Sequence, residues 1–189
     1  MKLLRTALVL FAFLTILTGL VYPLLVTGLA QVLFARQANG SVVVSGGQVL
    51  GSERIGQAFA DPRYFWGRLS ATAETAYNAS ASGGSNLSVL NPALQQQVQD
   101  RLAALRAADP GNPLPVPVDL VTASASGLDP HISPAAARYQ AGRVAQLRGL
   151  PVERVLALVD QSTENRVLGF LGEARVNVLA LNLALDGLQ

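Results

Sequence analysis

The chain has 189 residues, half of them hydrophobic, and a formal net charge of +2. Because phosphate binding needs clustered cations, this small and scattered positive charge argues against nucleic acid as a partner. The chain has no cysteine and a single histidine, so disulfides, thiolate metal sites and cysteine nucleophiles are excluded, and we expect no metal site.

Residues 7–34 form an uncharged apolar stretch, ALVLFAFLTILTGLVYPLLVTGLAQVLF. It exceeds the ~20 residues that a spanning helix needs, whereas the apolar part of a cleaved signal peptide has only about 7–15. We therefore expect an uncleaved transmembrane helix, with a cleaved signal as the alternative. Lys2 and Arg5 precede it and only Arg36 follows closely. The positive-inside rule then predicts that residues 1–6 are cytoplasmic and that residues 35–189 lie outside a bacterial inner membrane.

Small and polar residues in this stretch are spaced to share one face of a helix. Thr15, Thr18, Gly19 and Tyr22 follow the spacing i, i+3, i+4, i+7. Such a stripe permits close helix approach and interhelical hydrogen bonds, and Pro23 frees a backbone carbonyl that needs a neighbour. The pattern predicts packing against a partner helix; a simple tether is the alternative.

The first part of the outer region reads as a hairpin, an aromatic patch, a loop and a helix. Two β-rich runs surround Ser45–Gly47, and three aromatic residues at 64–66 suggest core or interface rather than a ligand platform. Residues 70–91 are rich in Ala, Ser, Asn and Gly, so we expect an irregular loop. The Asn91-Pro92 cap signature predicts a helix to about Ala108, and a short strand is expected at Val118–Val121.

The second part is predicted to be mostly helical. Ser133-Pro134 repeats the cap signature and predicts a helix to about Gly149, and Pro151 starts the next one. Residues 166–176 suggest a strand pair or an extended segment. Residues 177–188 fit strand or helix, and Asn177 as a cap favours helix. The core-facing positions expected on the helices are Leu94, Val98, Leu102, Leu105, Ala137, Ala141, Val144, Leu147, Val152, Val155, Leu158 and Val159.

These elements predict one transmembrane helix followed by a single extracytoplasmic mixed domain of α/β or α+β class, because about 150 residues suit one domain.

The single histidine lies in VTASASGLDPHIS, residues 121–133. A catalytic histidine needs a nucleophile and an orienting acid within hydrogen-bond reach. Asp129 is separated from His131 by Pro130, and Ser133 is expected to cap a helix. The chain also lacks a G-x-S-x-G motif, so a structural turn or a docking loop is the preferred interpretation, and we expect no catalytic residue.

A glycine-serine segment is a second candidate site. The backbone amides of Ser82, Gly83, Gly84, Ser85 and Asn86 could form a concave nest for an anion. No lysine follows, however, so the segment is not a P-loop, and a plain loop is the simpler interpretation.

The chain resembles one family along nearly its whole length. The segments that carry this resemblance are LTGLVYPLLVTGLAQ, GSERIGQAF, YFWGRLSA, YNASASGGSNL, NPAL, VPVDLVTASASGLDPHISPAAARYQAGRVA and LGEARVNVLALNLALD. They resemble the KdpC family, the single-span subunit of the KdpFABC potassium-transporting P-type ATPase, and the TASxSGLDPHIS block is specific to it. Leu69 and Ala174 stand where many members have proline, and Ser162 stands where histidine is common.

The resemblance implies an accessory subunit that joins a KdpA-like channel subunit, a KdpB-like ATP-hydrolysing subunit and a KdpF-like small subunit in the membrane lipid. It implies a catalytic chaperone that raises the ATP affinity of the hydrolysing subunit, with Ser82 to Asn86 likened to a nucleotide motif. A domain outside the membrane cannot touch a cytoplasmic nucleotide, so any such effect would be allosteric, typically ~1–3 kcal/mol. We expect no cofactor bound to this chain itself.

Two other classes stay open. A membrane-tethered hydrolase would use His131 with a nearby serine, and a tethered binding module would hold a small anion at Ser82 to Asn86. Neither needs a partner helix, so the polar stripe of the span favours the transporter subunit.

Overall fold

The structure, a computed structural model, describes residues 2–188. The chain divides into two compact units, one that ends at Leu50 and one that begins at Gly51.

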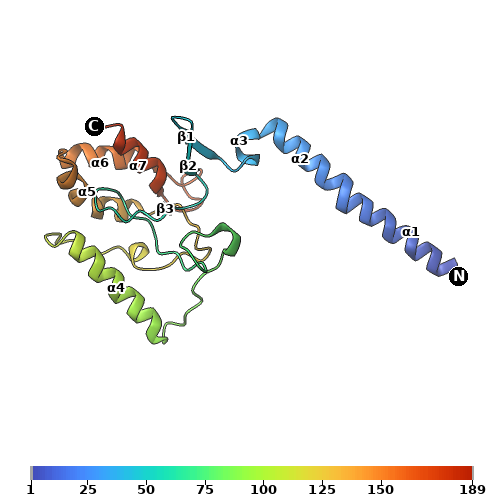
Figure 1. The fold of residues 1–189 in the computed structure, drawn as a ribbon, viewed down its shortest axis with the longest axis horizontal. Coiled ribbons are helices and arrows are strands. Elements are labelled where there is room, and N and C mark those ends of the chain that lie inside the picture. The colour runs from blue at the N-terminus through green and yellow to red at the C-terminus, as the bar shows by residue number, and fades with distance from the viewer. Residues whose placement is uncertain (1, 189) are drawn as a thin grey trace. The chain divides into compact units, whose positions relative to one another are not determined.

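The first unit contains the apolar helix. Helix α1 (Lys2–Ile16), a π-helical turn (Leu17–Val21) and helix α2 (Tyr22–Leu33) follow one another without a break (Figure 1). Lys2–Leu33 has 32 residues, its most apolar 18-residue window has a mean hydropathy of 2.4, and none of that window is buried within the protein. At 1.5 Å per residue it is ~48 Å long, enough to cross the ~30 Å core of a bilayer. The expected N-terminal apolar helix is therefore present.

The π turn was not predicted from the sequence. The amide of Tyr22 donates to the carbonyl of Leu17, five residues earlier, and Pro23 follows directly. A proline lacks the amide proton and its ring crowds the carbonyl four residues earlier, here that of Gly19. The wider turn accommodates the ring without breaking the helix. A wider turn also holds more residues. It therefore shifts the angular position of Tyr22 around the helix axis, relative to Thr15, away from the one that uniform α-helical spacing predicts.

The predicted hairpin is present. After helix α3 (Ala35–Ala38), strands β1 (Val42–Ser45) and β2 (Gln48–Ser52) pair in a two-stranded sheet. Gly46 and Gly47 connect them with φ of +56° and +80°. Two consecutive positive φ angles fit the twist of a tight hairpin, and glycine adopts them at no steric cost.

The second unit is of α+β class. Its helices are α4 (Pro92–Ala108), α5 (Pro134–Arg148), α6 (Val152–Gln161) and α7 (Val178–Asp186); its strands are β3 (His131–Ile132), β4 (Thr163–Glu164) and β5 (Arg175–Asn177). The strands form an antiparallel sheet in the order β3-β5-β4, with His131 opposite Asn177 and Thr163 opposite Val176. Helices α5 and α7 contact β5, and α6 contacts both helices (Figure 1).

Polar caps start three of these helices where the sequence indicated. The side-chain oxygens of Asn91, Ser133 and Asn177 accept hydrogen bonds of 2.9, 3.0 and 3.0 Å from amides two or three residues later. Each satisfies a backbone donor that the helix leaves free. Residues 178–186 are therefore helical, as the Asn177 cap favoured, and Gly149 ends α5 with φ of +65°.

The core lies between α5, α6, α7 and β5, with Phe65 and Trp66 packed into it. Phe65 and Trp66 of the aromatic patch are thus core, as expected, whereas Tyr64 is half-buried. The predicted inward positions Leu147 and Val152 are exposed instead. They lie close to the connection between α5 and α6, and α5 turns Gln140 and Arg143 inward in place of a purely apolar stripe.

The strand expected at Val118–Val121 is wrong: Val118–Leu120 is a 3-10 turn. The amide of Leu120 donates to the carbonyl of Pro117, and Asp119 accepts from the amide and hydroxyl of Ser133. These hydrogen bonds, one within the turn and two to Ser133, outweigh the β propensity of the valines.

Of the strand pair predicted within residues 166–176, β5 overlaps the end of that range, and β4 lies just before its start. Between them the chain makes a tight turn, in which Val167 and Leu171 exchange two hydrogen bonds of 2.9 Å. Four apolar side chains stand exposed on this turn: Val167, Leu168, Phe170 and Leu171.

The aromatic segment at 65–66 is held by side chains instead of a neighbouring strand. The amide and carbonyl of Phe65 bond to the side-chain amide of Asn182 at 2.9 and 3.0 Å. Those of Trp66 bond to Gln140 at 2.8 and 3.1 Å. Because all these groups are buried, the two amide side chains satisfy backbone that would otherwise lose its hydrogen bonds.

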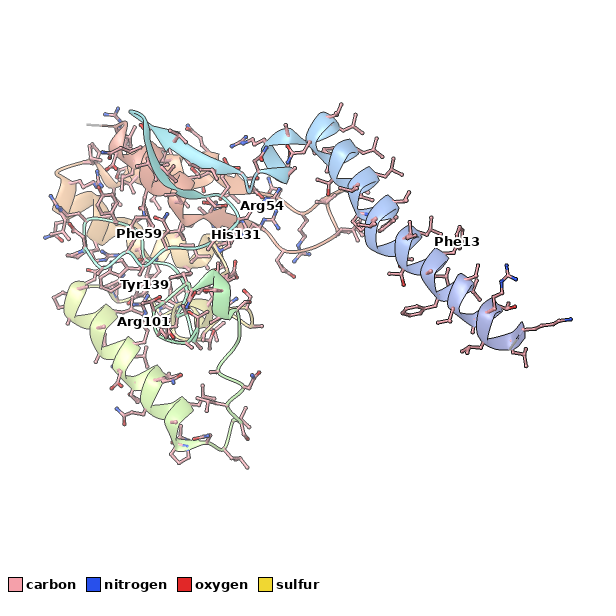
Figure 2. The ribbon with its side chains drawn as sticks, turned by 45° about the vertical axis from the view of Figure 1, so that its right-hand side comes forward. Phe13, Arg54, Phe59, Arg101, His131 and Tyr139 are labelled. Atoms are coloured by element: carbon pink, nitrogen blue, oxygen red, sulfur yellow. The ribbon has the colours of Figure 1, made fainter. Side chains whose placement is uncertain are left out.

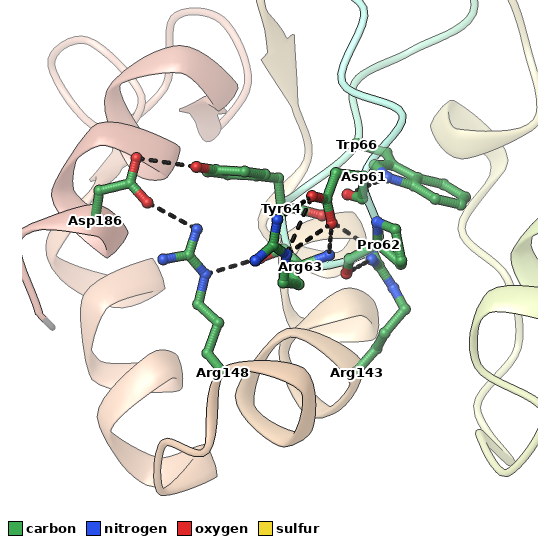
Figure 3. Close-up of polar contacts among 8 residues, drawn as sticks. All are labelled: Asp61, Pro62, Arg63, Tyr64, Trp66, Arg143, Arg148 and Asp186. Carbon is green, nitrogen blue, oxygen red and sulfur yellow. Dashed lines mark hydrogen bonds and ion pairs between the residues drawn. The ribbon is translucent and has the colours of Figure 1, made fainter.

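Arg143 anchors the same segment (Figure 3). It donates to the carbonyls of Pro62 and Tyr64, and its guanidinium lies 4.6 Å from the ring centroid of Trp66. Only 3% of the residue is exposed. Burial disfavours its charge and lowers the pKa of Arg143 to about 10.

Arg148 fastens the neighbouring stretch to the C-terminal helix (Figure 3). It donates to the carbonyl of Arg63 at 2.9 Å and pairs with Asp186 at 2.8 Å. The hydroxyl of Tyr64 also donates to Asp186, at 3.3 Å, and its ring lies 4.5 Å from the Arg148 guanidinium.

Candidate functional site

The predicted docking loop lies at an edge of the three-stranded sheet. Asp129 precedes β3 and His131 begins it, and both line an open pocket of about 420 Å³. The pocket also brings in charged side chains from distant parts of the chain: Arg68, Asp119, Glu173 and Arg175. Figure 2 marks His131 on this unit. The sequence prediction found the loop but not the charges around it.

Asp129 is the centre of this charged group. Its Oδ1 accepts the His131 amide at 3.0 Å and lies 3.4 Å from Nδ1 of that ring, and its Oδ2 accepts from Arg68 at 3.2 Å. Burial opposes its ionisation, but the hydrogen bonds from His131 and the charge and hydrogen bond of Arg68 outweigh burial, so the pKa of Asp129 is lowered. The carboxylate is therefore ionised and ordered at neutral pH.

Ser133 is committed to structure. Its hydroxyl accepts from the Ala136 amide at 3.0 Å and donates to Asp119 at 3.1 Å. A nucleophilic serine would need its hydroxyl directed at the histidine base. The loop thus orders a turn and exposes charge, and its geometry provides no activated serine at position 133.

The glycine-serine segment packs on the loop that precedes Asp129. The hydroxyl of Ser82 and the amide of Gly83 both donate to the carbonyl of Ser126, at 3.0 and 2.9 Å. The Gly83 amide is consequently used within the protein and is not free for a nest. Binding of an anion by Ser82 to Asn86 stays a prediction.

Glycine is required where these two segments touch. A Cβ on Gly84 would lie 2.8 Å from the carbonyl oxygen of Ala125, and Gly127 has φ of +69° with no room for a side chain beside Thr72. Such backbone-to-backbone contact explains the glycines without a ligand.

The predicted packing residues of the span are exposed on the isolated helix. Thr15, Gly19 and Tyr22 are uncovered, and Thr18 donates its hydroxyl to the Leu14 carbonyl at 2.7 Å. A Cβ added to Gly19 meets nothing within 4 Å in the described chain. The side chains of the polar stripe and Pro23 are therefore exposed among residues 2–188, and packing against another subunit stays a prediction.

Sequence reasoning missed Arg68 and Arg175. Arg68 is 61 positions from Asp129, beyond the reach of any helical or strand period, and Arg175 reaches the pocket through the pairing of β5 with β3. Only the fold brings these residues together. Within residues 2–188 no group of three or more His, Asp or Glu side chains is placed to hold a metal ion.

Comparison with known proteins identifies one family. The family described as "KdpC: K+-transporting ATPase, c chain" matches residues 4–187. A protein of Variovorax paradoxus named "Potassium-transporting ATPase KdpC subunit" is 69% identical over 182 residues, covering 96% of this chain and 94% of its own. A protein of the same name from Polaromonas naphthalenivorans is 67% identical over 188 residues, covering 100% and 96%.

Proposed function

The chain belongs to the KdpC family, and we propose that it is a non-catalytic, membrane-anchored subunit of a potassium-transporting P-type ATPase. The observation that supports this most is the family match, which runs from within the apolar helix to the last helix. A likeness confined to the outer domain would leave the anchor unexplained.

The span supports a role in assembly. Its helix combines an exposed polar stripe, an open Gly19 and a π turn at Pro23, features that favour contact with another helix over a lipid-only environment. We expect KdpA-like, KdpB-like and KdpF-like subunits as partners. The positive-inside rule places the N-terminus in the cytoplasm and the domain outside.

The outer domain would act on ATP hydrolysis at a distance. With the proposed orientation it cannot reach a cytoplasmic nucleotide, so a chaperone effect on ATP affinity must pass through packed helices. No cofactor of its own is needed for this effect.

Complementation tests the proposal. A strain that lacks this chain but keeps the other transporter subunits should fail to grow at micromolar potassium, and the full chain should restore growth. Residues 35–189 exported without the span should not restore it. A tethered hydrolase would keep its activity without the anchor, so rescue by the anchorless form would contradict the proposal.

Asp129 offers a finer prediction. If its pocket lies near the external potassium entrance, Asp129→Asn should reduce uptake at micromolar potassium more than at millimolar potassium, because a local negative charge raises the nearby cation concentration. Rates of potassium uptake by whole cells measure this. Equal loss at both concentrations would point to defective assembly instead.

A further inference from the structure

Asp129 also lines a second pocket, to which the family assignment gives no role. It measures about 560 Å³ and is lined by Arg54, Arg68, Ser124, Ser126 and Asp129, among others. Figure 2 marks Arg54 on this unit. The two pockets share Arg68 and Asp129, but Arg54 and Ser124 line only this one.

Two polar atoms at this pocket are buried without a hydrogen-bond partner in the described protein: the hydroxyl oxygen of Ser124 and Nε of Arg68. Ser124 is only 3% exposed. An unsatisfied buried polar group costs ~1–3 kcal/mol, so an exception calls for an explanation. Arg68 Nε can only donate, so its missing partner is an acceptor, and the Ser124 hydroxyl can donate to the same acceptor.

The charges at the pocket favour an anion. Two arginines and one aspartate line it, which leaves a net charge of +1 from two positive groups less one negative. Asp129 is already paired with Arg68 and accepts the His131 amide. The backbone amide of Arg54 bonds to the Ser52 hydroxyl, and within residues 2–188 the guanidinium of Arg54 makes no hydrogen bond or ion pair.

We propose that Arg54, Arg68 and Ser124 form a binding site for a phosphate-type oxyanion. Ser126 adds a second hydroxyl: it accepts the Leu128 amide at 3.1 Å and keeps its proton to donate. Guanidiniums and hydroxyls that converge on one space match an anion with several acceptor oxygens. The volume leaves room for a substituent on the phosphate, so free phosphate and the headgroup of an anionic lipid share this chemistry.

The test uses the full chain in a neutral detergent. Its thermal unfolding midpoint is followed against inorganic phosphate, with sodium chloride at equal ionic strength as the reference. The variants are Arg54→Gln, which alters an exposed side chain, and Ser124→Ala. The matched control is Arg138→Gln, an exposed arginine paired with Asp160 on α6.

We expect phosphate to raise the midpoint of the wild type and of Arg138→Gln. The apparent Kd for phosphate should rise ~10-fold or more in Arg54→Gln. The increase in midpoint that phosphate causes should be smaller in Ser124→Ala than in the wild type. Without phosphate, Ser124→Ala should be at least as stable as the wild type, because it removes an unsatisfied hydroxyl.

Nanodiscs separate the two sources. If anionic lipid stabilises the protein more than zwitterionic lipid does, if Arg54→Gln loses this difference, and if free phosphate has no effect, the ligand is a lipid headgroup. If free phosphate stabilises the protein in detergent, the ligand is a soluble oxyanion. A response equal to that of chloride with no lipid effect, or one unchanged in both variants, would overturn the proposal. Marked destabilisation of Ser124→Ala without phosphate would also overturn it, by showing an internal partner.

Discussion

At the scale of the residue, Asp129 gives the clearest pH prediction. Its pKa is lowered, because His131 and Arg68 outweigh the effect of burial. A carboxyl with a folded pKa below its unfolded value of ~3.9 stabilises the protein above that value and loses this contribution as pH falls through the folded pKa.

Asp129→Asn should therefore be less stable than the wild type at neutral pH, and the difference should shrink as pH falls below ~4. Unfolding midpoints of the full chain in detergent across pH measure this. The exposed Asp160→Asn serves as a control, since its carboxylate is 59% exposed and its pair with Arg138 should contribute little. A difference that stays constant with pH would contradict the account.

Arg143 predicts a large loss of stability. Arg143→Leu would leave the partly buried carbonyls of Pro62 and Tyr64 without their donor and would remove the stack on Trp66. We expect ~3 kcal/mol or more of destabilisation, because hydrogen bonds from a charged group are worth ~1.5–3 kcal/mol each. Denaturant unfolding measures it, with Arg138→Leu on the same helix as the control, expected to lose less than ~1 kcal/mol.

At the scale of the element, replacing Gly19 in the membrane-spanning helix tests whether a partner helix packs on it. A Cβ added to Gly19 meets nothing within 4 Å in the described chain, and Gly19 does not have a positive φ. The helix itself should therefore tolerate leucine, yet a neighbouring helix packed on this stripe should not. We expect reduced recovery of the other subunits with a tagged Gly19→Leu chain, and normal recovery with Ala7→Leu. Equal recovery for both would remove Gly19 from the interface.

Elements with local signals could be predicted from the sequence. Asn91, Ser133 and Asn177 start helices through bonds to amides two or three residues away, and Gly46-Gly47 makes a turn by its own φ angles. The strand expected at Val118–Val121 failed because Asp119 bonds to Ser133, 14 positions along the chain. The π turn was missed because α-helical spacing was assumed to continue up to Pro23.

The site shows the same limit. The Asp129 loop was found because its histidine is unique, but the pairing with Arg68 and the unsatisfied Ser124 depend on tertiary packing. The predicted anion segment assumed free backbone amides, whereas Gly83 donates its amide to Ser126 in the fold. The sequence shows which residues can carry a charge, and only the structure shows which groups those residues contact.

At the scale of the whole molecule, the proposed coupling to ATP is measurable. A purified transporter with the full chain should have a lower KM for ATP than one carrying only residues 1–50, which keep the span and lack the outer domain. A coupling of ~1–3 kcal/mol corresponds to about 5–150-fold. An unchanged KM in an intact complex would contradict an effect of the outer domain on nucleotide affinity.

The central claim is membership of a multi-subunit transporter, and affinity purification tests it most directly. The chain, tagged at its C-terminus, is purified in mild detergent from cells grown in low potassium, and the co-purified proteins are identified by mass spectrometry. The account predicts recovery of a P-type ATPase subunit and a large channel-like subunit, in constant ratio to the tagged chain. Recovery of the tagged chain alone from intact membranes would contradict it.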